Sequence, residues 1–266
     1  MTDYQFQAVE KTREEVKRSD MKDTCISVRN LNKSFSGRKV VNDLTFSVKK
    51  GEVYGILGHN GAGKSTSIDL ILGLKSPDSG SATILGMDAS KHRKQVFERV
   101  GVQLQHTEYQ SMMTVEDACS MYASLYSKPA DVDELLEVFD LTGLKKSLIN
   151  KLSGGERQKL SVVLALVGNP EVVFLDELTT GLDVAARREV WRTLKHLKER
   201  GLTIFLTTHY MEEAEALCDR VCLIKSGEKV LEGNISDVVK ASGKTNLEEA
   251  YLYFMGETDL LEERKL

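Results

Sequence analysis

A glycine-rich loop between an apolar run and a helical pattern constrains the fold of this chain more than any other feature. Residues 58–65 read GHNGAGKS and match the pattern GxxxxGK followed by Ser or Thr. Residues 53–57, before the loop, form a compact apolar run that is typical of a strand buried on both faces. After the loop, apolar residues recur at helical spacing over residues 65–74. This strand–loop–helix order predicts a phosphate-binding loop within an α/β fold.

The chemistry of phosphate binding explains the residue types of this loop. Glycine lets the backbone curl around an anion and point several N–H groups inward, and the helix N-terminus adds its dipole. Lys64 can reach the β- and γ-phosphates, and the Ser65 hydroxyl can hold Mg²⁺. The alternative is a glycine-rich turn followed by a lysine by chance, and the flanking strand and helix argue against it. His59 fills a variable position, so we interpret it as a solvated loop residue.

A second apolar run ends in two carboxylates. Residues 172–175 read VVFL, and Asp176 and Glu177 follow them. The carboxyl end of a buried strand delivers the next residues into the crevice where α/β sheets bind ligands. Phosphoryl transfer needs alignment and charge neutralisation, so Asp176 is a candidate ligand for Mg²⁺ and Glu177 a candidate for orienting or deprotonating water. An acidic pair at a strand end is common by itself, and only the phosphate loop makes the catalytic interpretation the stronger one.

The rest of the chain predicts an α/β organisation with a helical insertion. Strand patterns occur over residues 25–28, 40–48, 203–207, 221–225 and 229–232, the last two as a hairpin. Between residues 106 and 166 the pattern is mostly helical, with helices expected over 115–126, 132–141 and 156–167. A long helix is expected over 184–200, and a C-terminal one carries an apolar stripe of Leu247, Ala250, Tyr251 and Phe254. Thr245 and Glu248 are expected to form its capping box.

Composition and charge exclude several classes of protein. The 266 residues are 41% hydrophobic and 29% charged, which is too apolar for a disordered chain. A net charge of −4 argues against a dedicated nucleic-acid binder, because that class carries a basic excess. We expect no membrane-spanning segment and no signal peptide, because the longest apolar run, residues 160–167, is short. The 4 cysteines lack metal-site spacing and are expected to be small buried hydrophobes.

A third motif makes the family resemblance plain. Residues 152–156 read LSGGE and precede a helix, and together with the phosphate loop and the acidic strand end they occur in a characteristic order. The chain resembles the nucleotide-binding ATPase subunit of an ABC transporter over roughly residues 25–233. The resemblance implies a P-loop NTPase core with an N-terminal antiparallel β subdomain and an inserted α-helical subdomain. The expected divisions are a charged leader over 1–23, the ATPase domain over 24–240 with the helical subdomain over about 106–166, and a helical tail over 241–266.

The resemblance implies a role for each matching residue, with ATP and Mg²⁺ as the cofactors. Phe35 matches the aromatic residue that stacks on adenine, and its alternative is a core position in the first hairpin. Gln105 matches the glutamine that contacts Mg²⁺ and water, with Gln103 as a nearby decoy. His209 matches the switch histidine that contacts the γ-phosphate. Metal binding by His209 is disfavoured, because no second ligand lies at a fitting spacing. The other matches are the phosphate loop, Asn60, Gly61, Ala62, Gly63, Lys64, Ser65 and Thr66; the signature, Ser153, Gly154 and Gly155; and the connecting loop with Asp183.

Two residues depart from the family pattern. Glu156 stands where the family commonly has glutamine, and Leu178 stands where proline commonly follows the catalytic glutamate. Neither position carries a phosphate-contacting role, so we expect ATPase activity to survive. Leu178 removes the fixed φ that proline would supply to the following turn.

The resemblance also implies partners and a location. It implies a second ATPase subunit, identical or different, an integral-membrane permease, and a peripheral position on the cytoplasmic face of the membrane. The runs around residues 176–183 and 209–215 resemble exporter ATPases for drugs, antibiotics or polysaccharides. The alternatives are a non-transport ABC ATPase that acts on DNA or ribosomes and a regulator that binds ATP without turnover. The single cassette, the lack of a long heptad insertion and the intact Glu177 and His209 argue against them.

Overall fold

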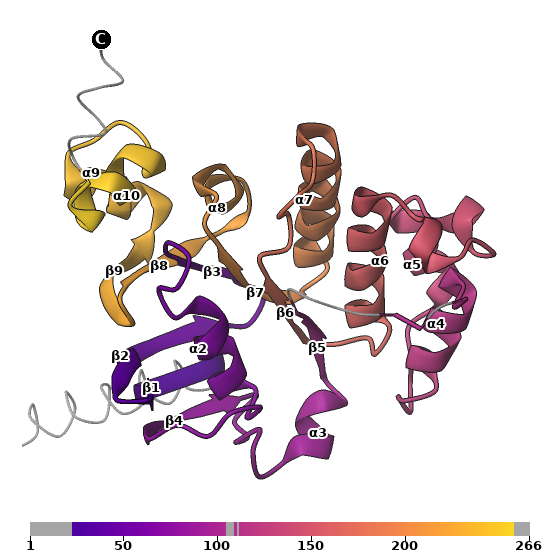
Figure 1. Ribbon diagram of the computed structural model, residues 1–266, viewed down its shortest axis with the longest axis horizontal. Coiled ribbons are helices and arrows are strands. Elements are labelled where there is room, and N and C mark those ends of the chain that lie inside the picture. The colour runs from indigo at the N-terminus through magenta and orange to yellow at the C-terminus, as the bar shows by residue number, and fades with distance from the viewer. Residues whose placement is uncertain (1–22, 105–108, 111, 258–266) are drawn as a thin grey trace, which may run out of the picture.

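Two sheets form the framework of the chain (Figure 1). The computed structural model describes residues 23–104, 109, 110 and 112–257. The smaller sheet is antiparallel, with strand order β2-β1-β4. Its strands are β1 (Thr24–Phe35), β2 (Arg38–Lys49) and β4 (Ser79–Ile84). This confirms the expected antiparallel subdomain near the N-terminus, although no apolar alternation indicated β4.

The larger sheet has the order β5-β6-β7-β3-β8-β9. The first five strands in this order are parallel, and β9 pairs with β8 in an antiparallel hairpin, as expected. Every residue of β3, β6 and β7 is buried, because helices and the smaller sheet cover both faces. The strands are β3 (Val53–Leu57), β5 (Val100–Gln103), β6 (Val172–Asp176), β7 (Thr203–Thr208), β8 (Arg220–Lys225) and β9 (Glu228–Asn234).

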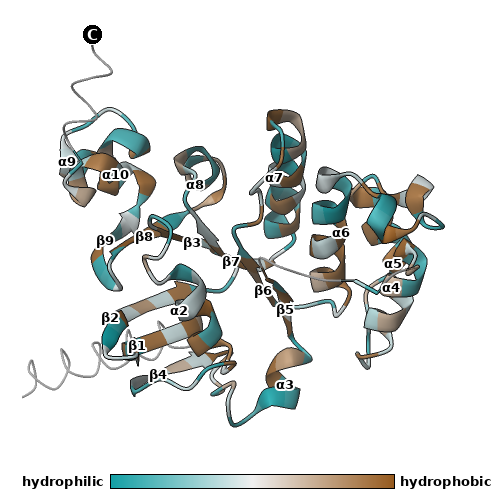
Figure 2. Ribbon diagram, in the orientation of Figure 1, coloured by the Kyte–Doolittle hydropathy of each residue, from teal (hydrophilic) through white to brown (hydrophobic). Residues whose placement is uncertain are grey.

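Aromatic side chains join the two sheets. Phe46 of β2 stacks on Tyr54 of β3 with ring centroids 5.1 Å apart, and Phe205 of β7 lies 5.9 Å from Phe46. Phe174 of β6 extends the group, 5.1 Å from Phe205. Figure 2 shows that the hydrophobic residues concentrate on these core strands. The smaller sheet is therefore held on the larger one by apolar burial, and β3, which carries the phosphate loop, lies at the junction.

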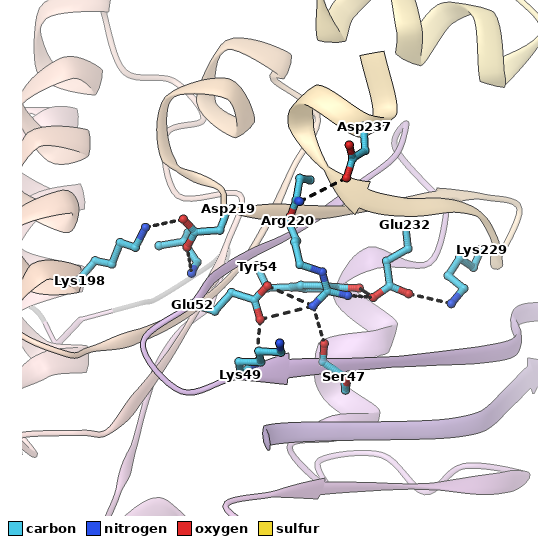
Figure 3. Close-up of polar contacts among 12 residues, drawn as sticks. Ser47, Lys49, Glu52, Tyr54, Lys198, Asp219, Arg220, Lys229, Glu232 and Asp237 are labelled. Atoms are coloured by element: carbon cyan, nitrogen blue, oxygen red, sulfur yellow. Dashed lines mark hydrogen bonds and ion pairs between the residues drawn. The ribbon is translucent and has the colours of Figure 1, made fainter. Parts of the chain in front are cut away.

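An ion-pair network lies next to this aromatic group, at the end of β3 opposite the phosphate loop. Arg220 of β8 donates from Nη1 to Glu52 Oε1 at 3.1 Å and to the Ser47 carbonyl of β2 at 3.2 Å (Figure 3). Its Nη2 donates to Glu232 of β9, which also accepts the Tyr54 hydroxyl at 2.9 Å. The guanidinium lies over the Tyr54 ring, 5.3 Å from the centroid. One arginine thus connects β2, β3, β8 and β9 at the end where β3 begins.

Helices from the middle of the chain form a separate layer beside the larger sheet. They are α4 (Val115–Ala123), α5 (Val132–Val138) and α6 (Gly154–Leu166), with short 3₁₀ turns η1 (Thr142–Leu144) and η2 (Ile149–Lys151). Helix α5 ends before the expected Leu141, because Asp140 takes a left-handed φ of 55° that a helix cannot continue through. Helix α6 begins two residues earlier than expected, because Ser153 caps it in a reciprocal pair with Glu156.

The other helices surround the larger sheet and close the chain. They are α2 (Lys64–Ile71), α3 (Arg93–Phe97), α7 (Val184–Glu199), α8 (Met211–Leu217), α9 (Ile235–Ser242) and α10 (Leu247–Met255). In α10 the expected stripe faces the core, with Leu247 and Ala250 fully buried. The capping-box prediction is wrong, because the Asn246 side chain caps the helix and accepts from the Glu249 backbone N–H. In the part of the chain that the structure describes, no helix is long and apolar enough to cross a membrane.

Candidate active site

The phosphate loop turns sharply between β3 and α2. Gly63, the N-cap of α2, has a φ of 104°, and a Cβ there would lie 2.4 Å from the Val40 carbonyl oxygen. Only glycine fits this position without moving the backbone of β2. The loop borders a pocket of about 340 Å³. The pocket is lined by Val40, Asn60, Gly61, Gly63, Lys64, Ser65, Thr66 and Glu177, while Ala62 is fully buried beneath it.

Lys64 connects the loop to the second motif. Its side chain is buried, and Nζ donates to the carbonyls of Gly58 at 2.9 Å and His59 at 3.2 Å. The same ammonium lies 3.0 Å from Glu177 Oε1. Two motifs more than one hundred residues apart in the sequence therefore meet at one buried ion pair, because β3 and β6 end at the same edge of the sheet.

Asp176 is the last residue of β6 and is buried. Its Oδ1 accepts the hydroxyl of Thr207 on β7, and Ser65 is a further hydrogen-bond partner. Burial raises the pKa of Asp176, and the hydrogen bonds from Thr207 and Ser65 oppose this rise. A hydroxyl and a carboxylate oxygen side by side are hard donors of the kind that Mg²⁺ prefers, so these residues fit the ion.

Glu177 lies between Lys64 and His209. Nδ1 of His209 is 3.5 Å from Glu177 Oε1 and has no hydrogen-bond partner among the described residues. The backbone of Glu177 is left-handed, with a φ of 49°, and its N–H donates to the Thr207 carbonyl at 3.1 Å. Backbone strain of this kind in a non-glycine residue gathers at functional sites. The turn directs the Glu177 carboxylate back into the loop pocket rather than along the strand.

Phe35 is at the end of β1 and is 41% exposed. The core interpretation of this residue is therefore wrong. The ammonium groups of Lys33 and Lys75 lie 5.4 Å and 5.6 Å from the ring centroid. An exposed ring with two cations beside it is suited to stacking on a base and to nearby phosphate charge.

The signature and the connecting loop are not part of this cluster. Ser153 caps α6, Asp183 caps α7 by accepting from the Ala186 N–H at 2.9 Å, and both caps are exposed. Figure 1 shows α6 well separated from α2. Gly155 approaches the connecting-loop side, where a Cβ would lie 3.5 Å from Ala186. Within one chain, the signature and the phosphate loop therefore form two distinct surfaces.

Gln105 lies outside the described residues, so its predicted contacts stay a prediction. Gln103, the decoy, ends β5 and is buried, with its amide donating to the Leu104 carbonyl at 2.7 Å. Leu178, one of the two departures from the family pattern, is 2% exposed and packs in the apolar core. It thus contributes to stability without reaching the pocket.

Sequence reasoning missed three residues near the site. Thr207 was predicted only as part of a strand, whereas its hydroxyl donates a hydrogen bond to Asp176. Val40 places its carbonyl against Gly63, a contact that no local pattern indicates. Glu213 belongs to the charged run over residues 209–215, and nothing in that run indicated that its carboxylate is buried, with 2% exposure. The sequence offered one indication of the role of Thr207, namely the pair of threonines directly before His209.

The cysteines have the character that their spacing predicted. All four are free, with Cys25, Cys119 and Cys222 buried and Cys218 half-buried. Burial raises the pKa of the Cys25 and Cys119 thiols to about 11 and of Cys222 to about 12. They pack as apolar groups.

Known proteins share this sequence and fold. The family described as ABC transporter matches residues 41–180. Nod factor export ATP-binding protein I of Burkholderia orbicola is 42% identical over 213 residues, which cover 78% of this chain and 70% of that protein. The solved structure of an ATP-binding subunit of an ABC transporter has a TM-score of 0.80 at 28% identity and covers 87% of this chain and 100% of its own.

A further solved structure is the dimer of a bacterial ABC transporter cassette. It has a TM-score of 0.70 at 25% identity and covers 79% of this chain and 98% of its own. The family match spans more than half of the chain and includes both the phosphate loop and the acidic strand end. These findings favour transport over the alternatives on DNA or ribosomes. The chain belongs to the ABC transporter family, as an ATP-binding subunit that hydrolyses ATP to power transport.

Proposed function

We propose that this chain powers export through a separate integral-membrane permease, from a peripheral position on the cytoplasmic face of the membrane. The support for export is the 42% identity with a relative named for Nod factor export. The observation that supports the catalytic assignment best is the position of Glu177 Oε1, 3.0 Å from Lys64 and 3.5 Å from His209. A carboxylate between these two groups can act on water at a phosphate bound in the loop.

The nucleotide is held by two surfaces of the chain in this proposal. The backbone of residues 60–66 binds the phosphates, and Lys64 neutralises the charge between the β- and γ-phosphates. Phe35 stacks on adenine from the exposed end of β1. Asp176 and Ser65 would hold Mg²⁺, with Gln105 as a further ligand, and the ion would supply positive charge to the phosphates.

Glu177 and His209 carry the chemistry in this proposal. Glu177 accepts a proton from the attacking water or orients it in line with the γ-phosphate. His209 contacts the γ-phosphate and holds the Glu177 carboxylate through Nδ1, which lies 3.5 Å from Glu177 Oε1. Thr207 fixes Asp176 from the neighbouring strand, so that the two acidic residues keep separate roles.

A second ATPase subunit completes the site. We place the signature residues Ser153, Gly154 and Gly155 against the γ-phosphate of ATP bound by the partner, with Asp183 beside them. The exposed N-terminus of α6 supports this, because the helix dipole favours an anion at this end. The partner is identical or different, and the dimeric cassette with a TM-score of 0.70 supports the pairing. ATP, unlike ADP, bridges the two surfaces and favours the closed pair.

The domain divisions are part of the same proposal. Residues 24–240 form the ATPase domain, and the helical subdomain over about 106–166 moves with ATP and transmits this movement to the permease near Gln105. The position of α4, α5 and α6 as a layer beside the sheet supports such a unit (Figure 1). In the proposed tail over 241–266, α10 packs against α8, and residues 258–266 lie outside the described part of the chain.

Glu177→Gln tests the proposal. The variant should bind ATP, stop turnover and accumulate as a dimer in size-exclusion chromatography with ATP and Mg²⁺, and ADP should leave it monomeric. Glu199→Gln, the same change at an exposed position at the end of α7, is the control and should keep normal turnover. A Glu177→Gln chain that stays monomeric with unchanged ATPase activity would contradict the proposal.

A further inference from the structure

A buried carboxylate, that of Glu213, lies near His209 of the active site. Glu213 of α8 is 2% exposed, whereas Glu212 and Glu215 on the same helix are exposed. A carboxylate without contact to solvent requires hydrogen-bond donors, because its desolvation is otherwise unfavourable. The burial of one glutamate in a run of charged residues therefore indicates a specific set of partners.

The partners of Glu213 come from two other segments of the chain. Nε1 of Trp191, in the middle of α7, donates to Glu213 Oε1 at 3.2 Å. Burial raises the pKa of Glu213, and hydrogen bonds from Thr208 and Trp191 oppose the rise. The nearby His209 ring has the same opposing effect on this pKa.

Each segment carries a residue of the active site. Thr208 ends β7 and directly precedes His209. Trp191 is on the helix whose N-cap is Asp183. Glu213 therefore contacts the segments of the switch histidine and of the connecting loop at the same time.

A second contact joins the same two helices. Arg187, one helical turn before Trp191, places its guanidinium 5.3 Å from the ring centroid of Tyr210. Tyr210 is the N-cap of α8, and its ring lies 4.1 Å from that of His209. Residues of one face of α7 thus contact both ends of the segment between His209 and Glu213.

We propose that Glu213 is a positioning residue that holds His209 in register with α7, through Trp191 and Thr208. Contact between His209 and the γ-phosphate then moves α7 and the connecting loop at its N-terminus as one unit. Loss of the Glu213 carboxylate leaves the nucleotide contacts intact but frees His209 and α7 from each other. This inference rests on the role proposed above for His209.

The steady-state test compares Glu213→Gln with Glu212→Gln, the same change at the exposed neighbour. Glu213→Gln should lower kcat about tenfold with KM for ATP unchanged, because a misplaced catalytic group slows the chemical step rather than binding. Glu212→Gln should match the unmodified chain. Equal kcat values for the two variants would overturn the inference. Trp191→Phe, which removes the donor alone, should lower kcat in the same direction and gives a second variant if Glu213→Gln does not fold.

A spectroscopic test reads the coupling directly. Trp191 is the single tryptophan of the chain, so the intrinsic tryptophan fluorescence reports on its hydrogen bond to Glu213. In the Glu177→Gln background, ATP but not ADP should shift the Trp191 emission, and Glu213→Gln should abolish the shift. An unchanged shift in the double variant, or none in the single one, would overturn the inference. His209→Ala separates the two proposals. If His209→Ala keeps full turnover, the catalytic role proposed for His209 is wrong. If His209→Ala lowers turnover but Glu213→Gln does not, only the proposed coupling is wrong.

Discussion

The ammonium group of Lys64 lies 3.0 Å from the carboxylate oxygen Oε1 of Glu177, and the two side chains are 3% and 7% exposed. Each group has a second task in the proposed mechanism, Lys64 at the phosphates and Glu177 at the attacking water. Nucleotide must therefore compete with Glu177 for the same ammonium. The pair keeps both charges compensated inside the protein until phosphate reaches the loop.

The Lys64–Glu177 pair predicts a non-additive mutant cycle. Lys64→Met should lower the free energy of unfolding by about 3 kcal/mol, because it leaves a buried carboxylate unpaired, and should abolish ATP binding. Adding Glu177→Gln should restore most of the stability but none of the binding. Chemical denaturation without nucleotide and calorimetric ATP titration measure the two effects. Additive stability losses would show that the two charges do not stabilise each other.

Phe35 should affect affinity without affecting stability. The ring is 41% exposed, so Phe35→Ala should change the free energy of unfolding by less than about 0.5 kcal/mol. Loss of stacking should weaken ATP binding about five- to tenfold, at the lower end of base–aromatic stacking energies. Phe35→Trp should restore the affinity. Unchanged affinity in Phe35→Ala, measured by calorimetry, would place adenine elsewhere.

How much of this could be predicted from the sequence depends on how local the cause is. The β3 run and the Lys64 loop are specified by adjacent residues, so both their type and their bounds were predictable. Strand β4 was not, because half of its residues, SGSATI, are exposed and it forms a strand only by pairing with β1. The burial of Glu213 was hidden for the same reason, since Trp191 reaches it from another helix.

The four thiols should be unreactive in the folded chain. Because the thiolate is the nucleophile, a pKa of about 11 for Cys25 and Cys119 leaves almost none of it near neutral pH. Burial also raises the pKa of Cys222 to about 12 and of Cys218 well above its usual value. A thiol-specific reagent should modify no cysteine in the native protein and four after unfolding in guanidinium. Rapid modification of any cysteine in the native state would contradict the burial of that thiol.

Glu213 should give stability a pH dependence that glutamine removes. Because the folded pKa of Glu213 is raised, the native state binds its proton more tightly than the unfolded chain. The free energy of unfolding should therefore fall as pH rises from the usual glutamate range, about pH 4, through the raised pKa. Glu213→Gln should flatten this part of the profile and be at least as stable as the unmodified chain at neutral pH. Melting temperatures across this range, with Glu212→Gln as the exposed control, check the sign.

Arg220 should support the fold without touching the chemistry. It joins Glu52 and Glu232 at the end of β3 opposite the phosphate loop, and the Glu52 side chain is 8% exposed (Figure 3). Arg220→Met leaves the buried Glu52 carboxylate without its cation, whereas Glu232 keeps Lys229, so the free energy of unfolding should fall by about 3 kcal/mol. Adding Glu52→Gln should recover much of that loss, because no uncompensated buried charge remains.

The Arg220 prediction is separable from any effect on catalysis. At temperatures where the variant stays folded, kcat and KM for ATP should match those of the unmodified chain, since the network lies at the opposite end of the sheet from Glu177. Arg192→Met, the same change at an exposed position of α7, should alter stability by less than about 0.5 kcal/mol. A fall in kcat for folded Arg220→Met would mean that the junction between the two sheets transmits strain along β3 to the phosphate loop.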